Sequence, residues 1–411
     1  YASVFYSHIA HGKIIRLDLE EALSSPGVKD ILTYKDIPGE NQIGGIILDE
    51  PLLAEDHVHY IGMPIALVIA EDEIMARNAV KKIITEIKPY PILTDPREAF
   101  KKGELIIPPE IFSCGDIENA WKECDVIIKG ECDTGGQEHL YLETQGAIAI
   151  PAEGGGIKLI SSTQGPTTVQ RVAAKVLGIS MNKIEVEVLR LGGGFGGKED
   201  QATPWAVMTA LAAMKLNKPV KLILPRHDDM IMTGKRNPYS SDFKIGLKSD
   251  GKIIAYEASF FQNAGASADL SPAILDRTLF HCTNSYFIPN VKATGYCCKT
   301  NLPPNTAFRG FGGPQGKFVI ECAIHKAAEK MGMLPSEIQK INLLKEGDEF
   351  PYGQKALHAQ AISSWNAAEE SFKPEEIRER INNFNSENKY YKKGFAYMPI
   401  CFGIAFTNTK M

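Results

Sequence analysis

The sequence lacks the features of several common protein classes. Its eight cysteines include no C-x-x-C pair and no spacing typical of zinc ligands, so we expect no structural zinc site. No apolar run approaches about 18 residues, the length that a transmembrane helix needs. Lys and Arg are scattered along the chain and the net charge is −5. We therefore expect neither nucleic acid nor an anionic membrane as a partner.

An initiator methionine is also missing. The chain begins at Tyr1, and the residues that follow predict a strand and not a signal peptide. Residues 401–407 predict an apolar strand that stops soon after it starts, so we expect a fragment or a processed piece. A 44% hydrophobic content over 411 residues is enough for a large core and two or three domains. The cysteines are expected to be reduced, mostly buried thiols in the cytoplasm.

Short strands and helices alternate along the chain, which predicts a mixed fold of the α+β or α/β kind. In the first 100 residues the patterns predict strands at 11–19, 28–34 and 64–70, and an amphipathic helix over 74–87. Further on they predict strands at 126–131, 145–151, 157–164, 183–191 and 219–224, and helices at 167–177 and 205–215. A hairpin is expected to join 242–248 to 252–261, and helices are expected at 317–331 and over much of 335–390.

The most unusual stretch is residues 191–200, where five glycines surround Phe195. A backbone without side chains can adopt positive φ repeatedly and turn its N–H groups toward an anion or an oxo group. The stretch lies between a predicted strand and a predicted helix. Because N–H groups at the start of a helix favour negative charge, we consider it a candidate binding loop.

Two known fingerprints fit this loop in part. Gly192, Gly194 and Gly197 satisfy the dinucleotide pattern G-x-G-x-x-G, but no acidic residue follows about 20 positions later to hold a ribose. Lys198 completes the first seven positions of a phosphate-binding loop, but Glu199 then stands where a Ser or Thr should meet magnesium. A nucleotide-binding module that uses residues 192–198 and a purely structural turn both stay open.

Other candidate ligand positions are spread along the chain. A second loop of glycines and aromatics, residues 306–315, precedes a helix, and two such loops indicate two sides of one cavity. The polar cluster at 134–144 is either a solvated loop or part of that cavity. Gln164 ends a predicted strand, where α/β sheets place ligands. Arg277 lies among apolar residues, and the pattern favours a surface position over an inward-pointing anion reader.

Taken together, the motifs resemble the molybdenum-cofactor subunit or domain of the xanthine dehydrogenase and aldehyde oxidase family. The matching stretches are residues 135–143, 162–164, 192–199, 229–230, 234–238, 263–265 and 307–315. The resemblance implies an N-terminally truncated hammerhead α/β domain at 1–100, a linker at 101–124, and the first part of the molybdopterin-binding region at 125–411.

The same resemblance implies how the cofactor is held. In this family no side chain ligates molybdenum. Gln164 would hydrogen-bond an oxygen ligand, Phe195 would donate its backbone N–H to the oxo group, and Arg309 would lie beside the metal. FAD and [2Fe-2S] clusters are expected on other domains or subunits, and the complete assembly is expected to be a homodimer.

For the substrate, the resemblance implies a pocket in which Phe311 stacks on a planar ring. Glu199 would hydrogen-bond purine nitrogens, Arg277 would stabilise negative charge on the heterocycle, and Thr407 would lie at the pocket edge. This combination favours hypoxanthine or xanthine, with an aldehyde oxidase-type enzyme or another N-heterocycle hydroxylase as the alternative.

The implied reaction is attack by a metal-bound hydroxide on a purine carbon, with hydride transfer to a sulfido group. It needs a general base, which in relatives is a Glu in a Gly-x-Gly-Glu motif near the C-terminus. No such motif occurs here, so the base is expected beyond Met411. No catalytic residue is therefore assigned within the chain, and we expect it to be catalytically incomplete by itself.

Overall fold

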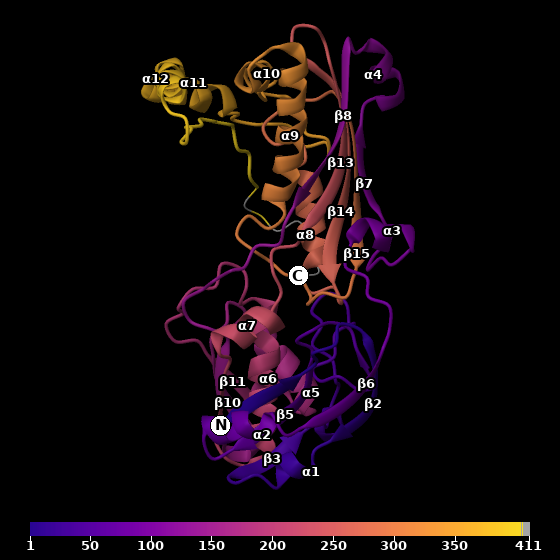
Figure 1. The fold of residues 1–411 in the computed structure, drawn as a ribbon, viewed down its shortest axis with the longest axis vertical. Helices are drawn as coiled ribbons and strands as arrows, with labels where there is room; N and C mark the ends of the chain where they lie inside the picture. Colours follow the sequence, from indigo (N-terminus) through magenta and orange to yellow (C-terminus); the bar gives the residue numbers. More distant parts are fainter. Residues whose placement is uncertain (404, 406–411) are drawn as a thin grey trace.

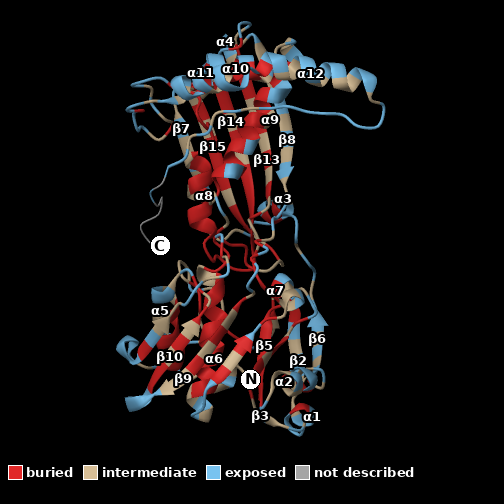
Figure 2. Ribbon diagram, turned by 90° about the vertical axis from the view of Figure 1, so that its left-hand side faces the viewer, coloured by how far each residue is buried: buried red, intermediate tan, exposed pale blue. Residues whose placement is uncertain are grey.

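The computed structural model describes residues 1–403 and 405. The described chain is elongated, with one half built on a seven-stranded sheet and the other half on a five-stranded sheet (Figure 1). Helices and strands alternate in both halves, which confirms the predicted mixed α/β class. Buried loops connect the two halves, among them residues 266–270 and 304–307 (Figure 2).

The seven-stranded sheet has the order β11-β10-β9-β12-β1-β5-β3. Its strands are β1 (Ala2–Tyr6), β3 (Val28–Leu32), β5 (Pro64–Ala70), β9 (Gly146–Ala152), β10 (Gly156–Ser161), β11 (Ile184–Glu187) and β12 (Val220–Ile223). Because β1 pairs with β12 in parallel, strands from the first 70 residues and from residues 146–223 form one sheet. The division into domains at residues 100 and 125 stays a prediction.

Strand β5 shows how this half is layered. All seven of its residues are buried, as the continuous apolar run predicts for a strand covered on both faces. Leu67 and Ile69 enter the core formed with α5 (Pro166–Leu177) and α6 (Thr203–Leu216). Ala66 and Val68 enter a second core. That core also contains residues of α1 (Glu20–Leu23) and α2 (Glu73–Val80).

The predicted helix over 74–87 is wrong in its second half. Helix α2 ends at Val80, and β6 (Ile84–Pro89) follows. Strand β6 pairs antiparallel with β2 (Gly12–Asp18), which also pairs with β4 (His57–Val58) in a three-stranded sheet. Isoleucines at 83, 84 and 87 fit one face of a helix, but β-branched side chains suit a strand as well, and pairing with β2 decides the outcome.

The five-stranded sheet has the order β7-β15-β14-β13-β8. Its strands are β7 (Glu110–Cys114), β8 (Val126–Thr134), β13 (Tyr239–Leu247), β14 (Ile253–Gly265) and β15 (Asn290–Lys299). The β13–β14 pair contains the predicted hairpin. Helices α8 (Ser271–Phe280) and α9 (Gly313–Met331) cover one face, and α3 (Pro96–Lys101) and α4 (Ile117–Glu123) lie on the other (Figure 1). Residues 101–124, the predicted linker, thus include β7 and α4.

The remaining helices are α7 (Arg226–Met232), α10 (Pro335–Ile341), α11 (Ala361–Phe372) and α12 (Pro374–Glu387). Among residues 1–403 and 405, none of the helices is long and apolar enough to span a membrane. All eight cysteines carry free thiols, three of them buried and five partly buried.

Candidate functional site

The first glycine loop follows β11, which ends at Glu187 and is shorter than the predicted strand over 183–191. Gly193, Phe195 and Gly196 have positive φ angles of 99°, 57° and 101°. No hydrogen bond within the described residues uses the N–H groups of Gly193, Gly194 or Phe195. The φ angle is positive at Gly193 and Phe195 but not at Gly194. Successive N–H groups on such a backbone can bind an anion or an oxygen atom together.

Gln164 follows the end of β10 and lies directly against this loop. Its backbone N–H donates to the carbonyl oxygen of Lys198 at 2.7 Å. Its Oε1 accepts from the N–H of Gly196 at 2.9 Å and from that of Lys198 at 3.3 Å. A Cβ on Gly194 would lie 2.3 Å from Oε1, so a larger residue at position 194 would displace the Gln164 side chain. Since Oε1 is occupied by the loop, Nε2 is left to donate to a ligand.

The second glycine loop, residues 306–315, touches the first. The N–H of Arg309 donates to the carbonyl oxygen of Phe195 at 2.8 Å. A Cβ on Gly196 would lie 2.7 Å from the carbonyl oxygen of Ala307, so the two backbones approach as closely as glycine permits. Nε2 of the buried His139 lies 2.7 Å from the same oxygen. The structure therefore brings together Gln164, Phe195 and Arg309, which the sequence separates by up to 145 positions.

Two residues that sequence reasoning assigned no role support the second loop. Arg236 donates from Nη2 to the carbonyl oxygen of Arg309 at 2.9 Å and from Nε to Gln137 at 2.9 Å. Its guanidinium lies 4.1 Å from the centre of the Phe308 ring. The centres of the His139 and Phe308 rings are 4.6 Å apart. Both residues lie within stretches that carry the family resemblance, and this position is the sequence feature that could have identified them. Burial lowers the pKa of His139 and favours a neutral imidazole.

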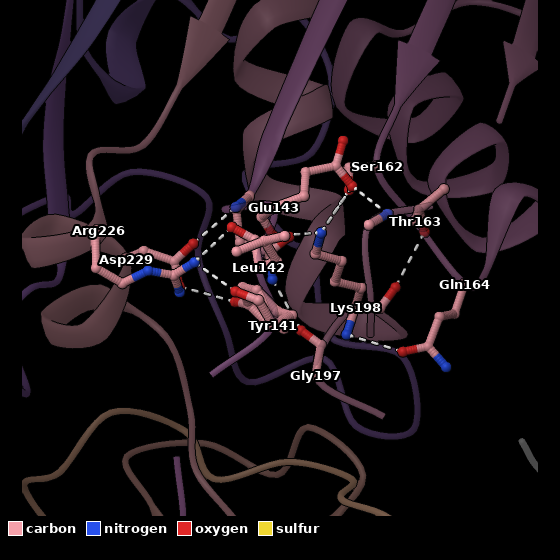
Figure 3. Close-up of polar contacts among 12 residues, drawn as sticks. Tyr141, Leu142, Glu143, Ser162, Thr163, Gln164, Gly197, Lys198, Arg226 and Asp229 are labelled. Atoms are coloured by element: carbon pink, nitrogen blue, oxygen red, sulfur yellow. Dashed lines mark hydrogen bonds and ion pairs between the residues drawn. The ribbon is translucent and has the colours of Figure 1, made fainter. Parts of the chain in front are cut away.

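Lys198, the residue that completed the phosphate-loop pattern, points into the protein (Figure 3). Its side chain is 0% exposed. Nζ donates to the backbone oxygen of Glu143 at 2.7 Å, to Oε2 of Glu143 at 3.1 Å and to Oγ of Ser162 at 2.7 Å. Nζ also lies 4.5 Å from the centre of the Tyr141 ring. All three ammonium protons are engaged, so Lys198 is not available to a phosphate, which argues against the nucleotide-binding alternative.

Glu143 receives three donors at one carboxylate oxygen. Besides Lys198, these are the N–H of Gly192 at 2.8 Å and the hydroxyl of Ser162 at 2.7 Å. Partial burial raises the pKa of Glu143, but the hydrogen bonds from Gly192, Ser162 and Lys198 outweigh it and lower the pKa overall. Burial lowers the pKa of Lys198, and the pairing with Glu143 opposes that shift. The contact of 3.1 Å between Nζ of Lys198 and Oε2 of Glu143 favours the charged form of both groups.

Glu199 directly follows and is partly buried. Burial, and then the charge of Asp200, raise the pKa of Glu199 to about 7. A carboxyl group with a pKa raised toward neutrality can donate a hydrogen bond when protonated and accept one when ionised.

Arg277 contradicts the prediction of a surface position, because only 5% of the residue is exposed. Eight of the ten residues of α8 are buried, so the helix has no solvent face on which Arg277 could lie. Its Nη1 and Nη2 donate to the carbonyl oxygens of Gly403 and Ala405. Nε is buried and has no hydrogen-bond partner among residues 1–403 and 405. Thr407, the other residue expected at the pocket edge, lies outside the described residues.

Phe311 lies beside α8. It has a φ angle of 46° and packs on a small apolar cluster that includes Leu270, Ile274 and Ala307. The next residue, Gly312, accepts a hydrogen bond at its carbonyl oxygen from Oγ1 of Thr278 at 3.1 Å. The second loop therefore contacts both the first loop and the helix of Arg277. Within the described residues, Glu199 and Arg277 form no ion pair with each other.

Comparison with known proteins gives the class of protein to which this site belongs. The chain belongs to the family described as molybdopterin cofactor-binding domain, whose sequence model matches residues 102–343. The model of the aldehyde oxidase and xanthine dehydrogenase a/b hammerhead domain matches residues 1–91. The predicted family is thus confirmed. No group of three or more His, Cys, Asp or Glu that could hold a metal ion occurs in the part of the chain that the structure describes.

Individual relatives narrow the comparison. The chain is 41% identical over 408 residues to the xanthine dehydrogenase/oxidase of Gallus gallus, covering 99% of this chain and 30% of the relative. It is 39% identical over 407 residues to the xanthine dehydrogenase of Dictyostelium discoideum, with the same two coverages. An aldehyde oxidoreductase structure from Desulfovibrio gigas is 26% identical, with a TM-score of 0.87 over 95% of this chain and 44% of the other. The chain thus spans about 30% of the length of the curated relatives it matches.

Proposed function

We propose that the chain binds molybdopterin where the two glycine loops meet, and that it forms part of an enzyme that hydroxylates purines such as hypoxanthine and xanthine in their breakdown. One observation carries the site: three consecutive N–H groups, from Gly193 to Phe195, have no partner within the described residues and lie beside Gln164. The names of the relatives support the substrate class, since the two compared above are a xanthine dehydrogenase/oxidase and a xanthine dehydrogenase.

The residues at the loop contact fit a ligand rich in oxygen atoms. Phe195 donates through its backbone and Gln164 through Nε2, while Arg309, whose backbone bonds to the first loop, adds positive charge. When bound, the molybdenum cofactor supplies the two-electron oxidation chemistry. Because the donors belong to a loop that closely packed neighbours hold in place, they stay oriented without reorganising during the reaction.

We propose that the substrate lies between Phe311 and the polar groups of Glu199 and Arg277. The Phe311 ring offers a face for stacking a planar heterocycle. Glu199, with a pKa raised by burial to about 7, can donate to an unprotonated ring nitrogen or accept from a ring N–H. Arg277 is buried and charged, and its Nε has no partner in the described part of the chain. A charge-assisted hydrogen bond to negative charge on the ring contributes about 1.5–3 kcal/mol.

Oxidation of aldehydes is the second candidate activity. One observation favours it: Nη1 and Nη2 of Arg277 are both committed to the carbonyl oxygens of Gly403 and Ala405, which leaves only Nε for a heterocycle. The aldehyde oxidoreductase structure also shares this fold at a TM-score of 0.87. An aldehyde carries no ring nitrogen for Glu199 or Arg277 to bind.

Kinetics of Arg277→Met on the two substrate classes tests the proposal. We expect kcat/KM for xanthine to fall about 10- to 100-fold, because one charge-assisted hydrogen bond is lost, while kcat/KM for benzaldehyde changes less than about threefold. Arg277→Lys, which keeps the charge, should retain more purine activity than Arg277→Met. Lys158→Met, which removes an exposed ion pair on β10, is the control. Equal losses on both substrates would refute the purine assignment.

The proposal includes partners. We expect iron–sulfur and flavin domains or subunits to carry electrons away, a homodimer of the complete assembly, and the general base beyond Met411. We expect no nucleic acid and no membrane as partners. The eight free thiols fit a reducing compartment such as the cytoplasm.

A further inference from the structure

We propose that Glu143 and Lys198 form a positioning pair that holds the first glycine loop in the shape that binds the cofactor. The inference rests on the proposed binding of molybdopterin at this loop and assigns the pair a role that neither residue has so far. Neither side chain touches the cofactor in this proposal. Both act through the backbone of residues 192–198.

The carboxylate of Glu143 ties the two ends of the loop to one point. Its Oε2 accepts the N–H of Gly192 at 2.8 Å, where the loop begins. The same oxygen accepts Nζ of Lys198 at 3.1 Å, where the loop ends. Oε1 of Gln164 holds the middle of the loop through the N–H of Gly196, and it also accepts the N–H of Lys198 at the end. With the ends and the middle held, the N–H groups of residues 193–195 are the ones that remain free.

The burial of Lys198 distinguishes this pair from an ordinary surface ion pair. An exposed pair contributes little, because water and salt screen it. Lys158, for comparison, is 36% exposed at its side chain and pairs with Glu185 and Glu187. Lys198 is 0% exposed, and its three donors all reach oxygens of Glu143 or Ser162. Removing the Glu143 carboxylate leaves the charge of Lys198 buried and unpaired, so the loop end must move to find water. Removing Lys198 releases the loop end from its tie to Glu143, whose side chain is 45% exposed.

Space for such a movement exists beside the loop. A hollow of about 240 Å³ is lined by Glu143, Ser162 and residues 188–191, which lead into the glycines. Residues 192–194 carry no side chains that could anchor the segment by packing. The ties to Glu143 and Gln164 therefore do the anchoring, and loss of the Glu143 ties lets residues 188–192 shift into the hollow and misorient the free N–H groups.

Molybdenum content is the readout, measured on the protein as the cell makes it, with its natural partner domains. Lys198→Met and Glu143→Gln should each lower molybdenum per polypeptide about tenfold, since groups that orient a metal-binding shell typically contribute that much. The double variant Glu143→Gln/Lys198→Met removes both charges and leaves no unpaired buried ion, so it serves where Glu143→Gln does not fold. Lys158→Met should retain full molybdenum content.

A core variant separates positioning from general stability. Ile324→Ala in α9 lies in the core of the five-stranded half and should lower the Tm at least as much as Lys198→Met does, yet keep its molybdenum. Unchanged molybdenum in the Glu143 and Lys198 variants, or an equal loss in Ile324→Ala, would overturn the positioning role. Wild-type protein without molybdenum would instead refute the proposed function, and the inference with it. Wild-type protein with molybdenum that oxidises only aldehydes would refute the purine assignment alone and leave the pair's role intact.

Discussion

Replacing Glu199 with Gln should make the protein more stable at alkaline pH. Burial, followed by the charge of Asp200, raises the pKa of Glu199 from the ordinary value of 4.5 to about 7. Below pH 4.5 the carboxyl is protonated in both the folded and the unfolded chain and does not change the free energy of unfolding. Between 4.5 and about 7 only the unfolded chain ionises, so stability falls as pH rises. Above about 7 the full difference, about 3 kcal/mol, has been lost.

Gln cannot ionise, so Glu199→Gln escapes this loss. The difference in free energy of unfolding between the variant and the wild type should grow by roughly 2–3 kcal/mol from pH 5 to pH 8, with the variant more stable at pH 8. Urea denaturation followed by circular dichroism at several pH values measures the difference. Asp269, whose pKa burial also raises to about 7, is present in both proteins and cancels in the comparison, whereas the interaction of Asp200 with Glu199 is part of the measured difference.

Glu143→Gln is the matched control, because Glu143 is also at the glycine loop and its pKa is shifted in the opposite direction. Burial alone would raise the pKa of Glu143, but its hydrogen bonds lower it overall. This carboxylate therefore stabilises the fold above its ordinary pKa, and the contribution is lost as pH falls through the lowered value. The variant should be less stable than the wild type at pH 8, with a deficit that shrinks in acid. The reasoning about Glu199 is wrong if both variants show the same pH trend or if Glu199→Gln shows none.

Two further substitutions test how the site is held together. Gly196→Ala places a methyl group 2.7 Å from the carbonyl oxygen of Ala307 at a φ of 101°, so it should cost about 2–4 kcal/mol in thermal denaturation, and an unchanged Tm would contradict the close contact of the loops. Asp229→Ala removes the acceptor of the Tyr141 hydroxyl at 2.8 Å and of the Gln145 N–H at 2.7 Å, both buried. Its cost should be about 2–5 kcal/mol in urea denaturation, and a cost below about 1 kcal/mol would show that other groups satisfy these donors.

The acidic surroundings of Glu199 also bear on the proposed activity. If Glu199 binds purine nitrogens with a pKa near 7, its protonation state changes within the working pH range of an enzyme. Substrates that need the protonated carboxyl and substrates that need the carboxylate should then have different pH profiles. The charge of the partly buried Asp200 acts on Glu199, and burial raises the pKa of Asp200 and of the buried Asp269.

Local sequence patterns were sufficient to predict the structure of segments whose conformation depends mainly on their own residues. The apolar run of β5 predicts a strand covered on both faces, and the glycines of residues 192–197 predict a backbone with positive φ. The two glycine loops are also recognisable as a pair, because side-chain-free stretches with aromatics are rare. The molybdopterin-binding family could be predicted from these motifs, since their residue types and order are specific.

Tertiary structure decided the features that depend on what a segment packs against. Residues 84–89 fit a helix face or a strand equally well, and pairing with β2 made them a strand. Arg277 lies in a pattern that suits a surface helix, but α8 is buried in the fold and Arg277 donates to the carbonyl oxygens of Gly403 and Ala405. Lys198 completes a phosphate-binding pattern, yet Glu143 and Ser162, 55 and 36 positions away, bind its ammonium group. Burial and charge pairing are long-range in sequence, so only the folded chain determines them.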